Sequence, residues 1–277
     1  MDFTIRIYRE FLECLKSAGY TFLSFEQFLK NPAEKVIILR HDVDLRPQNS
    51  LVTAQFEHEL GIVGSYYFRI GKESNNQDII RKIAELGHEI GYHYKTMDTA
   101  NGKLNVKSEK LKDKDELVEM AYEEFCKNLE YFRTLYPVKT ICMHGSPLSK
   151  FDNKDIWKRY DYKKLGLIGE PYFDVDFSKV LYLTDTGRRW NGERVSVRDK
   201  VQKTFNNSVN PQLSTVNYTF RHTKDIIKAA EKGLLPSQIM ITVHPQRWSD
   251  NHFSWTKELV LQNLKNLVKR ILINNRR

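Results

Sequence analysis

The chain has 277 residues, of which 40% are hydrophobic, so it can bury a substantial core and is not expected to be disordered throughout. No apolar run reaches the roughly 18–20 residues of a membrane-spanning helix, and we therefore expect no membrane span. The 44 lysines and arginines outnumber the 35 aspartates and glutamates, but runs such as KSEKLKDK at 107–114 mix both signs. We therefore expect no nucleic-acid partner.

The N-terminal segment has no basic stretch followed by an apolar run, which is the pattern of a secretory signal. The three cysteines, Cys14, Cys126 and Cys142, are too few and too scattered to form a disulfide framework. Both features predict a cytoplasmic protein with reduced thiols.

Helical and strand-like segments alternate along the first half of the chain. Apolar spacing predicts helices at 3–18 and 25–31, the second with Ser24 as its N-cap, and the run VIIL at 36–39 predicts a buried strand. There follow, in order, a helix at 47–60, a strand at 65–68, a helix at 78–86, a strand at 88–93, an irregular segment at 99–114, a helix at 115–135 and a strand at 140–143. This order predicts an α/β fold with a parallel sheet or a (β/α) barrel.

The alternation weakens after residue 150 and returns near the C-terminus. We expect short strands at 165–168 and 179–183, a helix at 223–232, a strand at 238–243 and a last helix at 254–273. No repeat or Pro/Gly-rich linker divides the chain, which predicts a single domain. Its expected parts are an N-terminal helical cap at 1–34, a barrel at 35–250 and a C-terminal helix at 251–277.

Titratable side chains follow four of these strands at the points where the strands end. They are Asp42, Asp44, His93, His144 and His244. The carboxyl ends of parallel strands meet at one edge of a sheet, where α/β folds build their active sites. A single such histidine is more often a buried or capping residue, and Asp44 alone would suit the N-cap of the helix at 47–60. Recurrence at the same place in each unit predicts a functional site instead.

Aspartate and histidine side chains around an open position are the ligands with which proteins hold a catalytic divalent metal. The strand period of two would point Asp42 and Asp44 the same way, and two close carboxylates repel unless a cation or proton lies between them. We expect one carboxylate to bind the metal and the other to take a proton from a bound water. His244 would then protonate a leaving amine.

Three motifs carry a family resemblance: HDVD at 41–44, GHEIGYH at 87–93 and the late strand that ends in His244. Together they resemble the polysaccharide deacetylase (NodB-homology, carbohydrate esterase) superfamily, in a divergent branch with an HDVD first motif. That family folds as a distorted (β/α) barrel and removes acetyl groups from amino sugars with a divalent metal, usually zinc. The resemblance implies Asp42 as the base, Asp44 and His93 as metal ligands, and His244 as the general acid.

The sequence departs from the family pattern at three places. One residue separates two aspartates that the family has as neighbours, Met97 stands where a second metal-binding histidine is expected, and MHGSP at 143–147 replaces an Arg-Pro-Pro-Tyr motif. A thioether is a poor zinc ligand, so another residue must complete the site. His144 is the first candidate, and His88 and Asp98 are weaker ones.

Four arginines lie within residues 188–198 and form a candidate substrate contact. Arg188 and Arg189 would suit an anionic sugar or a sugar nucleotide through bidentate contacts, or would belong to a solvated loop. Trp190 and Trp248, each beside an arginine, would stack on a sugar ring or pack in the core. We include these four residues among the expected substrate contacts.

The sequence thus favours a metal-dependent hydrolase that removes an acetyl or similar acyl group from an amino sugar or glycan precursor. One alternative is a metal-free hydrolase of a small cyclic amide, because some members of the superfamily dispense with the metal. Another is a barrel that binds carbohydrate without turnover. Metal content and the position of His144 separate the first two, and the presence of both Asp42 and His244 disfavours the third.

Overall fold

The computed structural model describes residues 1–106, 114–145, 149–191 and 218–274. Within them, all strands belong to one sheet and every strand pair is parallel. The strands are β1 (Thr21–Leu23), β2 (Val36–Val43), β3 (Ser65–Phe68), β4 (Glu89–Tyr94), β5 (Ile141–Met143), β6 (Leu181–Thr184) and β7 (Gln238–Val243). Their order is β5-β4-β3-β2-β7-β6, with β1 beside β2, and this path is open between β5 and β6.

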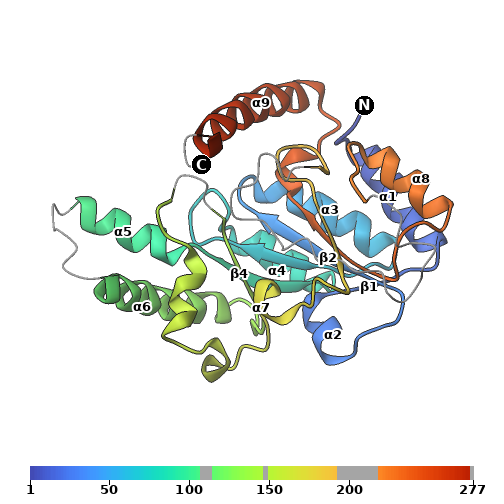
Figure 1. Ribbon diagram of the computed structural model, residues 1–277. Helices are drawn as coiled ribbons and strands as arrows, with labels where there is room; N and C mark the ends of the chain where they lie inside the picture. The colour runs from blue at the N-terminus through green and yellow to red at the C-terminus, as the bar shows by residue number, and fades with distance from the viewer. Residues whose placement is uncertain (107–113, 146–148, 192–217, 275–277) are drawn as a thin grey trace.

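Helices connect and cover these strands, as Figure 1 shows. The α-helices are α1 (Ile5–Ser17), α2 (Phe25–Lys30), α3 (Pro47–Glu59), α4 (Gln77–Glu85), α5 (Thr96–Val106), α6 (Lys114–Arg133), α7 (Pro171–Asp174), α8 (Thr223–Glu231) and α9 (His252–Asn274). Short 3₁₀ helices occur at η1 (Asn153–Lys158), η2 (Tyr162–Leu165) and η4 (Pro245–Arg247). The predicted α/β class is confirmed as parallel strands that form a half-barrel with helices around it. The division into parts of one domain stays a prediction.

β2 is the central strand, and all eight of its residues are buried. On one side it pairs with β7, and on the other with β1 along its first half and with β3 along its second. The strand continues past the predicted end at Leu39 to Val43, because β3 supplies backbone partners for Arg40 to Val43. Successive side chains of a strand alternate between its faces, so Arg40 and Asp42 share one face and His41 points to the other.

Most predicted elements are present, and two expectations are wrong. The segment from residue 99 is not irregular at its start, because α5 continues to Val106 and buries Met97 and Ala100 against the core; residues 107–113 lie outside the described part. No strand forms at 165–168, where Gly166 adopts a left-handed φ of 72° after η2.

Local signals set several helix starts. Ser24 caps α2 in a capping box with Gln27, as its sequence position predicts. Thr4 caps α1 by accepting a hydrogen bond from the backbone of Ile7.

Among the described residues, none of the helices combines the length and hydropathy that a bilayer span requires.

Candidate metal centre

The side chains predicted from the strand ends converge around Asp44. Its Oδ1 atom lies 3.3 Å from Nε2 of His144 and 3.7 Å from Nε2 of His93. Its Oδ2 atom lies 4.0 Å from Nε2 of His244. Oδ2 of Asp42 lies 3.8 Å from Nε2 of His93. The structure therefore brings together all five residues that the sequence singled out, at the carboxyl ends of β2, β4, β5 and β7.

Asp44 does not cap α3, which was the structural alternative for this residue. Arg46 occupies the N-cap position with a left-handed φ of 51° and makes no side-chain capping bond. The backbone amide of Asp44 instead donates to the carbonyl of Asp42, at 3.1 Å, as the chain leaves β2. This turn directs the Asp44 carboxylate toward the two histidines.

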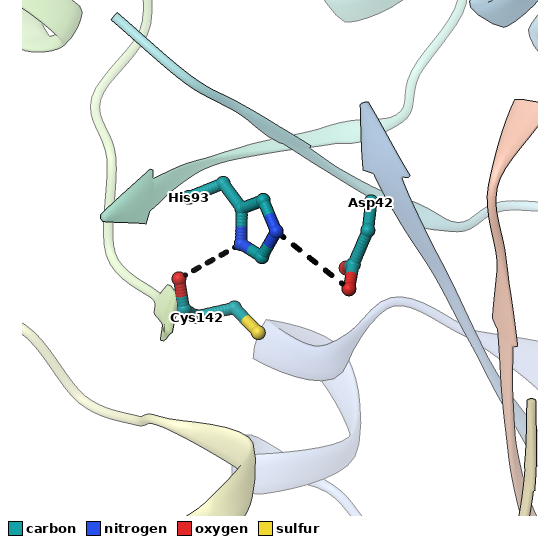
Figure 2. A group of neighbouring side chains, drawn as sticks. All are labelled: Asp42, His93 and Cys142. Atoms are coloured by element: carbon teal, nitrogen blue, oxygen red, sulfur yellow. Dashed lines mark hydrogen bonds and ion pairs between the residues drawn. The ribbon is translucent and has the colours of Figure 1, made fainter. Parts of the chain in front are cut away.

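The hydrogen bond of His93 to β5 decides which nitrogen of its ring is available. Nδ1 lies 3.0 Å from the backbone carbonyl oxygen of Cys142 (Figure 2), and a carbonyl can only accept, so Nδ1 carries the proton. Burial lowers the pKa of His93 to about 4, against the opposing effect of Asp42. The ring is therefore neutral at pH 7, and the lone pair of Nε2 points at the carboxylates.

Asp44 presents a second electron-rich atom at the same place. Burial raises its pKa, but the neighbouring histidines hold the pKa of Asp44 well below its usual range. Its Oδ1 atom is buried and has no hydrogen-bond partner among the described residues. Nη1 of Arg69 lies 3.8 Å from this oxygen, beyond hydrogen-bond distance. Two acceptors that face each other without a proton are stabilised by a cation between them.

The spacing of these atoms fits a metal ion. Asp44, His93 and His144 each offer one ligand atom, and the three atoms lie within 4.8 Å of one another. Ligands at about 2.0–2.1 Å in a tetrahedron are separated by roughly 3.4 Å, close to the 3.3 and 3.7 Å observed from Asp44. Two nitrogens and one carboxylate oxygen with an open fourth position form the donor set of a catalytic zinc site.

A second group, Asp42, His93 and Cys142, also has donor atoms within 4.8 Å of one another (Figure 2). However, Arg40 donates to both carboxylate oxygens of Asp42, at 2.8 and 2.6 Å. Burial raises the pKa of Asp42, but Arg40 outweighs this effect and the pKa falls to about 2. Because the guanidinium already neutralises Asp42, the group around Asp44 is the better metal site.

Asp185 holds His244 in place, and the sequence analysis did not single it out. Oδ1 of Asp185 accepts from Nδ1 of His244 at 2.6 Å, and Oδ2 accepts from its backbone amide at 3.0 Å. Burial raises the pKa of Asp185, but Arg247 and His244 lower it below its ordinary value, so the carboxylate is ionised. This pair leaves Nε2 of His244 directed at the site.

The weaker candidates for the metal shell lie elsewhere. His88 accepts from the amide of Gly64 at 3.1 Å and donates to the carbonyl of Ala54 at 2.9 Å, so both of its nitrogens are used in the core. Met97 is completely buried in the hydrophobic core, and Asp98 contacts Asn153 at 3.4 Å. His144, which follows β5, therefore provides the candidate ligand that Met97 cannot provide.

The two tryptophans do not offer a ring face to a sugar. Trp248 is fully buried and packs on Phe3 and Tyr8, with ring centroids 4.9 and 5.0 Å apart. Trp190 is 5% exposed and donates to Thr223 from its indole nitrogen. Of the two readings of these residues, the structure supports core packing, and the expected sugar contact of Trp190 and Trp248 is corrected.

The arginines have a different setting. Arg188 is buried beneath α9, where it donates to the carbonyl of Trp255 at 2.8 Å, and Arg189 bonds Asn191 at 2.6 Å. Both line a cavity of about 370 Å³ together with Arg221 and His222. Arg194 and Arg198, the rest of the predicted cluster, lie outside the described residues.

Glu170 is a buried carboxyl group that the sequence left without a role. Its Oε1 accepts from the amide of Met143 at 3.1 Å and its Oε2 from the amide of Tyr172 at 2.6 Å. It thereby ties the end of β5, immediately before His144, to α7. Burial raises the pKa of Glu170 to about 7, although these bonds lower it.

This pKa predicts a pH-dependent stability. A carboxyl group whose pKa is higher in the folded than in the unfolded chain stabilises the fold fully below about pH 4.5, and that contribution is lost as the pH rises through 7. We expect the free energy of unfolding of the wild type to fall by up to about 3 kcal/mol more than that of Glu170→Gln between pH 4.5 and 8. Chemical denaturation of both chains at several pH values measures this difference. Equal slopes for the two chains would contradict it.

No family model matches the sequence, and a comparison with curated proteins gives no match. Among solved structures, a neighbour is a mutant of BA3943, described as a CE4 family pseudoenzyme with restored enzymatic activity. It shares 11% identity with this chain at a TM-score of 0.42, over 86% of this chain and 65% of that one. The chain thus corresponds to 65% of the neighbour's length.

Proposed function

We propose that this chain is a metal-dependent hydrolase that removes an acetyl or similar acyl group from an amino sugar or glycan precursor in the cytosol. The observation that carries the proposal is the convergence of Asp44, His93 and His144, whose ligand atoms lie within 4.8 Å of one another, while Oδ1 of Asp44 has no hydrogen-bond partner among the described residues. Zinc suits this donor set best. The motifs shared with the deacetylase superfamily point to the same chemistry.

A metal held by Asp44, His93 and His144 would supply Lewis acidity for the acyl oxygen and for a bound water. Asp42 lies beside this site and is kept ionised by Arg40. Its low pKa makes it a weak base. A water that attacks a carbonyl carbon becomes strongly acidic as the new bond forms, so a fixed carboxylate of low basicity still accepts its proton.

His244 serves as the acid in this proposal. Asp185 accepts the proton of Nδ1 and so fixes the orientation of the ring. Nε2 faces the site, 4.0 Å from Oδ2 of Asp44. From there it donates to the nitrogen of the amine as the carbon–nitrogen bond breaks.

The cavity lined by Arg189 and Arg221 suits an anionic group on the substrate, such as a phosphate or carboxylate of a sugar. Arg188 shares this cavity, and its backbone amide donates to the carbonyl of Asp185, so the cavity adjoins the residues that position His244. We therefore propose that the substrate is an anionic amino-sugar derivative rather than a neutral one.

The test is the release of acetate from N-acetylated amino sugars, with and without an anionic group, by protein of measured metal content. We expect about one metal ion per chain, loss of turnover after chelation and recovery on adding zinc, and a lower KM for the anionic sugar. Full turnover without metal on a small cyclic amide would favour the metal-free alternative. Sugar binding without acetate release, by protein that holds its metal, would favour a non-catalytic relative.

A further inference from the structure

The last helix, α9, is amphipathic, but its apolar face is exposed and its polar face meets the protein. Six apolar side chains of its described part are exposed to between 40 and 78%: Phe253, Val260, Leu261, Leu264, Leu267 and Val268. Leu267 also lines the cavity beside Arg189. These six positions recur at intervals of three and four residues and so form one continuous face. A helix that only covered a core would bury this face.

The side of α9 that meets the protein is polar. Glu258, Gln262 and Asn266, spaced four residues apart, are each less than 7% exposed. Asn266 bonds the carbonyl of Gly187 at 3.0 Å and Gln262 bonds Asn266 at 2.8 Å. Hydrogen bonds thus hold α9 to the protein, and its apolar face is left for something else.

The charge of α9 limits what that partner can be. The segment at 252–274 carries Lys257, Lys265, Lys269 and Arg270 against one acid, Glu258, which points inward. Two copies of this helix would bring like charges together, which disfavours pairing with a second chain. An exposed apolar face on a helix that carries an excess of cations is the pattern of helices that lie in the surface of an anionic bilayer.

We propose that α9 binds the surface of an anionic membrane, with its apolar face among the acyl chains and its lysines at the lipid phosphates. α9 lies along the periphery of the molecule in Figure 1, where a flat surface can reach it. Arg46, two residues after Asp44, lies 3.9 Å from Glu258, so the bound helix sits next to the carboxyl end of β2. The inference does not depend on which reaction the site performs.

Co-sedimentation of the full chain with lipid vesicles tests the proposal. We expect at least about tenfold stronger binding to phosphatidylglycerol–phosphatidylcholine vesicles than to phosphatidylcholine alone, and a decrease as salt rises. The double variant Leu264→Asp, Leu267→Asp loses at least about tenfold, because two inserted side chains become charged. Leu234→Asp, at another exposed leucine, is the matched control and keeps wild-type binding. Lys257→Gln and Lys265→Gln each weaken binding about fivefold.

Circular dichroism of each variant establishes that it is folded. Binding that is absent, or equal for neutral and anionic vesicles, overturns the proposal. So does a vesicle-free dimer that the Leu264→Asp, Leu267→Asp variant dissociates, because a second copy would then cover this face. Unchanged binding by that folded variant would show that another surface meets the lipid.

Discussion

Asp44→Asn is expected to remove the bound metal and, with it, nearly all turnover. Asp44 is the residue that both metal-facing histidines share, at 3.3 Å from His144 and 3.7 Å from His93. An amide in its place keeps the size of the side chain but removes the negative charge, so metal affinity falls by at least about 10²-fold, more than for loss of an outer-shell partner. Elemental analysis after dialysis and the rate of acetate release measure the two effects together.

Asp42→Asn is the matched control, because it changes the neighbouring carboxylate in the same way. Arg40 already binds both oxygens of Asp42, so this variant should keep its metal and lose activity by about 10²–10⁴-fold. Cys142→Ala should also keep the metal, since Cys142 belongs to the group that we do not favour. Metal loss in Asp42→Asn and Cys142→Ala, but not in Asp44→Asn, would move the metal to that other group. Full activity in Asp42→Asn would show that Asp42 is not the base.

The strand-end pattern predicts which side chains meet at the candidate centre, but not the residues that position them. His144 could be chosen in place of Met97 because parallel strands direct their carboxyl ends to one edge, whatever the loop lengths between them. Arg40 was missed, although its alternation with Asp42 places both on one face of β2. Asp185 follows β6 as the histidines follow their strands. The sequence pattern of this short strand is weak, and the nearby arginines suggested substrate binding as the role of the segment.

The burial of the aromatic residues could not be predicted from local sequence. Trp248 stands beside Arg247, which suggests an exposed position. It is buried because Phe3 and Tyr8, from the other end of the chain, pack on it. The burial of the polar face of α9 could not be predicted from local sequence either. Helical spacing identifies an apolar stripe but does not say whether that stripe meets the protein or its surroundings.

His244→Ala is expected to separate amides from activated esters. The leaving nitrogen of an amide must gain a proton as the bond breaks, whereas a phenolate of low basicity leaves without one. The variant should therefore hydrolyse an N-acetyl sugar about 10²–10⁴-fold more slowly than the wild type, and lose much less activity on an aryl acetate. His244 is 4.0 Å from Asp44 and outside the proposed metal shell, so metal content should not change.

Asp185→Asn gives the second half of this experiment, as a change in a residue that positions His244. An amide does not accept the Nδ1 proton as strongly as a carboxylate does, so the ring is held less firmly in the orientation that points Nε2 at the site. Amide turnover should fall in the same sense as in His244→Ala, and by more than the turnover of an aryl acetate falls. A merely structural role would lower amide and ester rates equally. Equal loss on both substrates in His244→Ala would likewise remove the acid role, because the need for a proton on the leaving nitrogen is what distinguishes the two substrates.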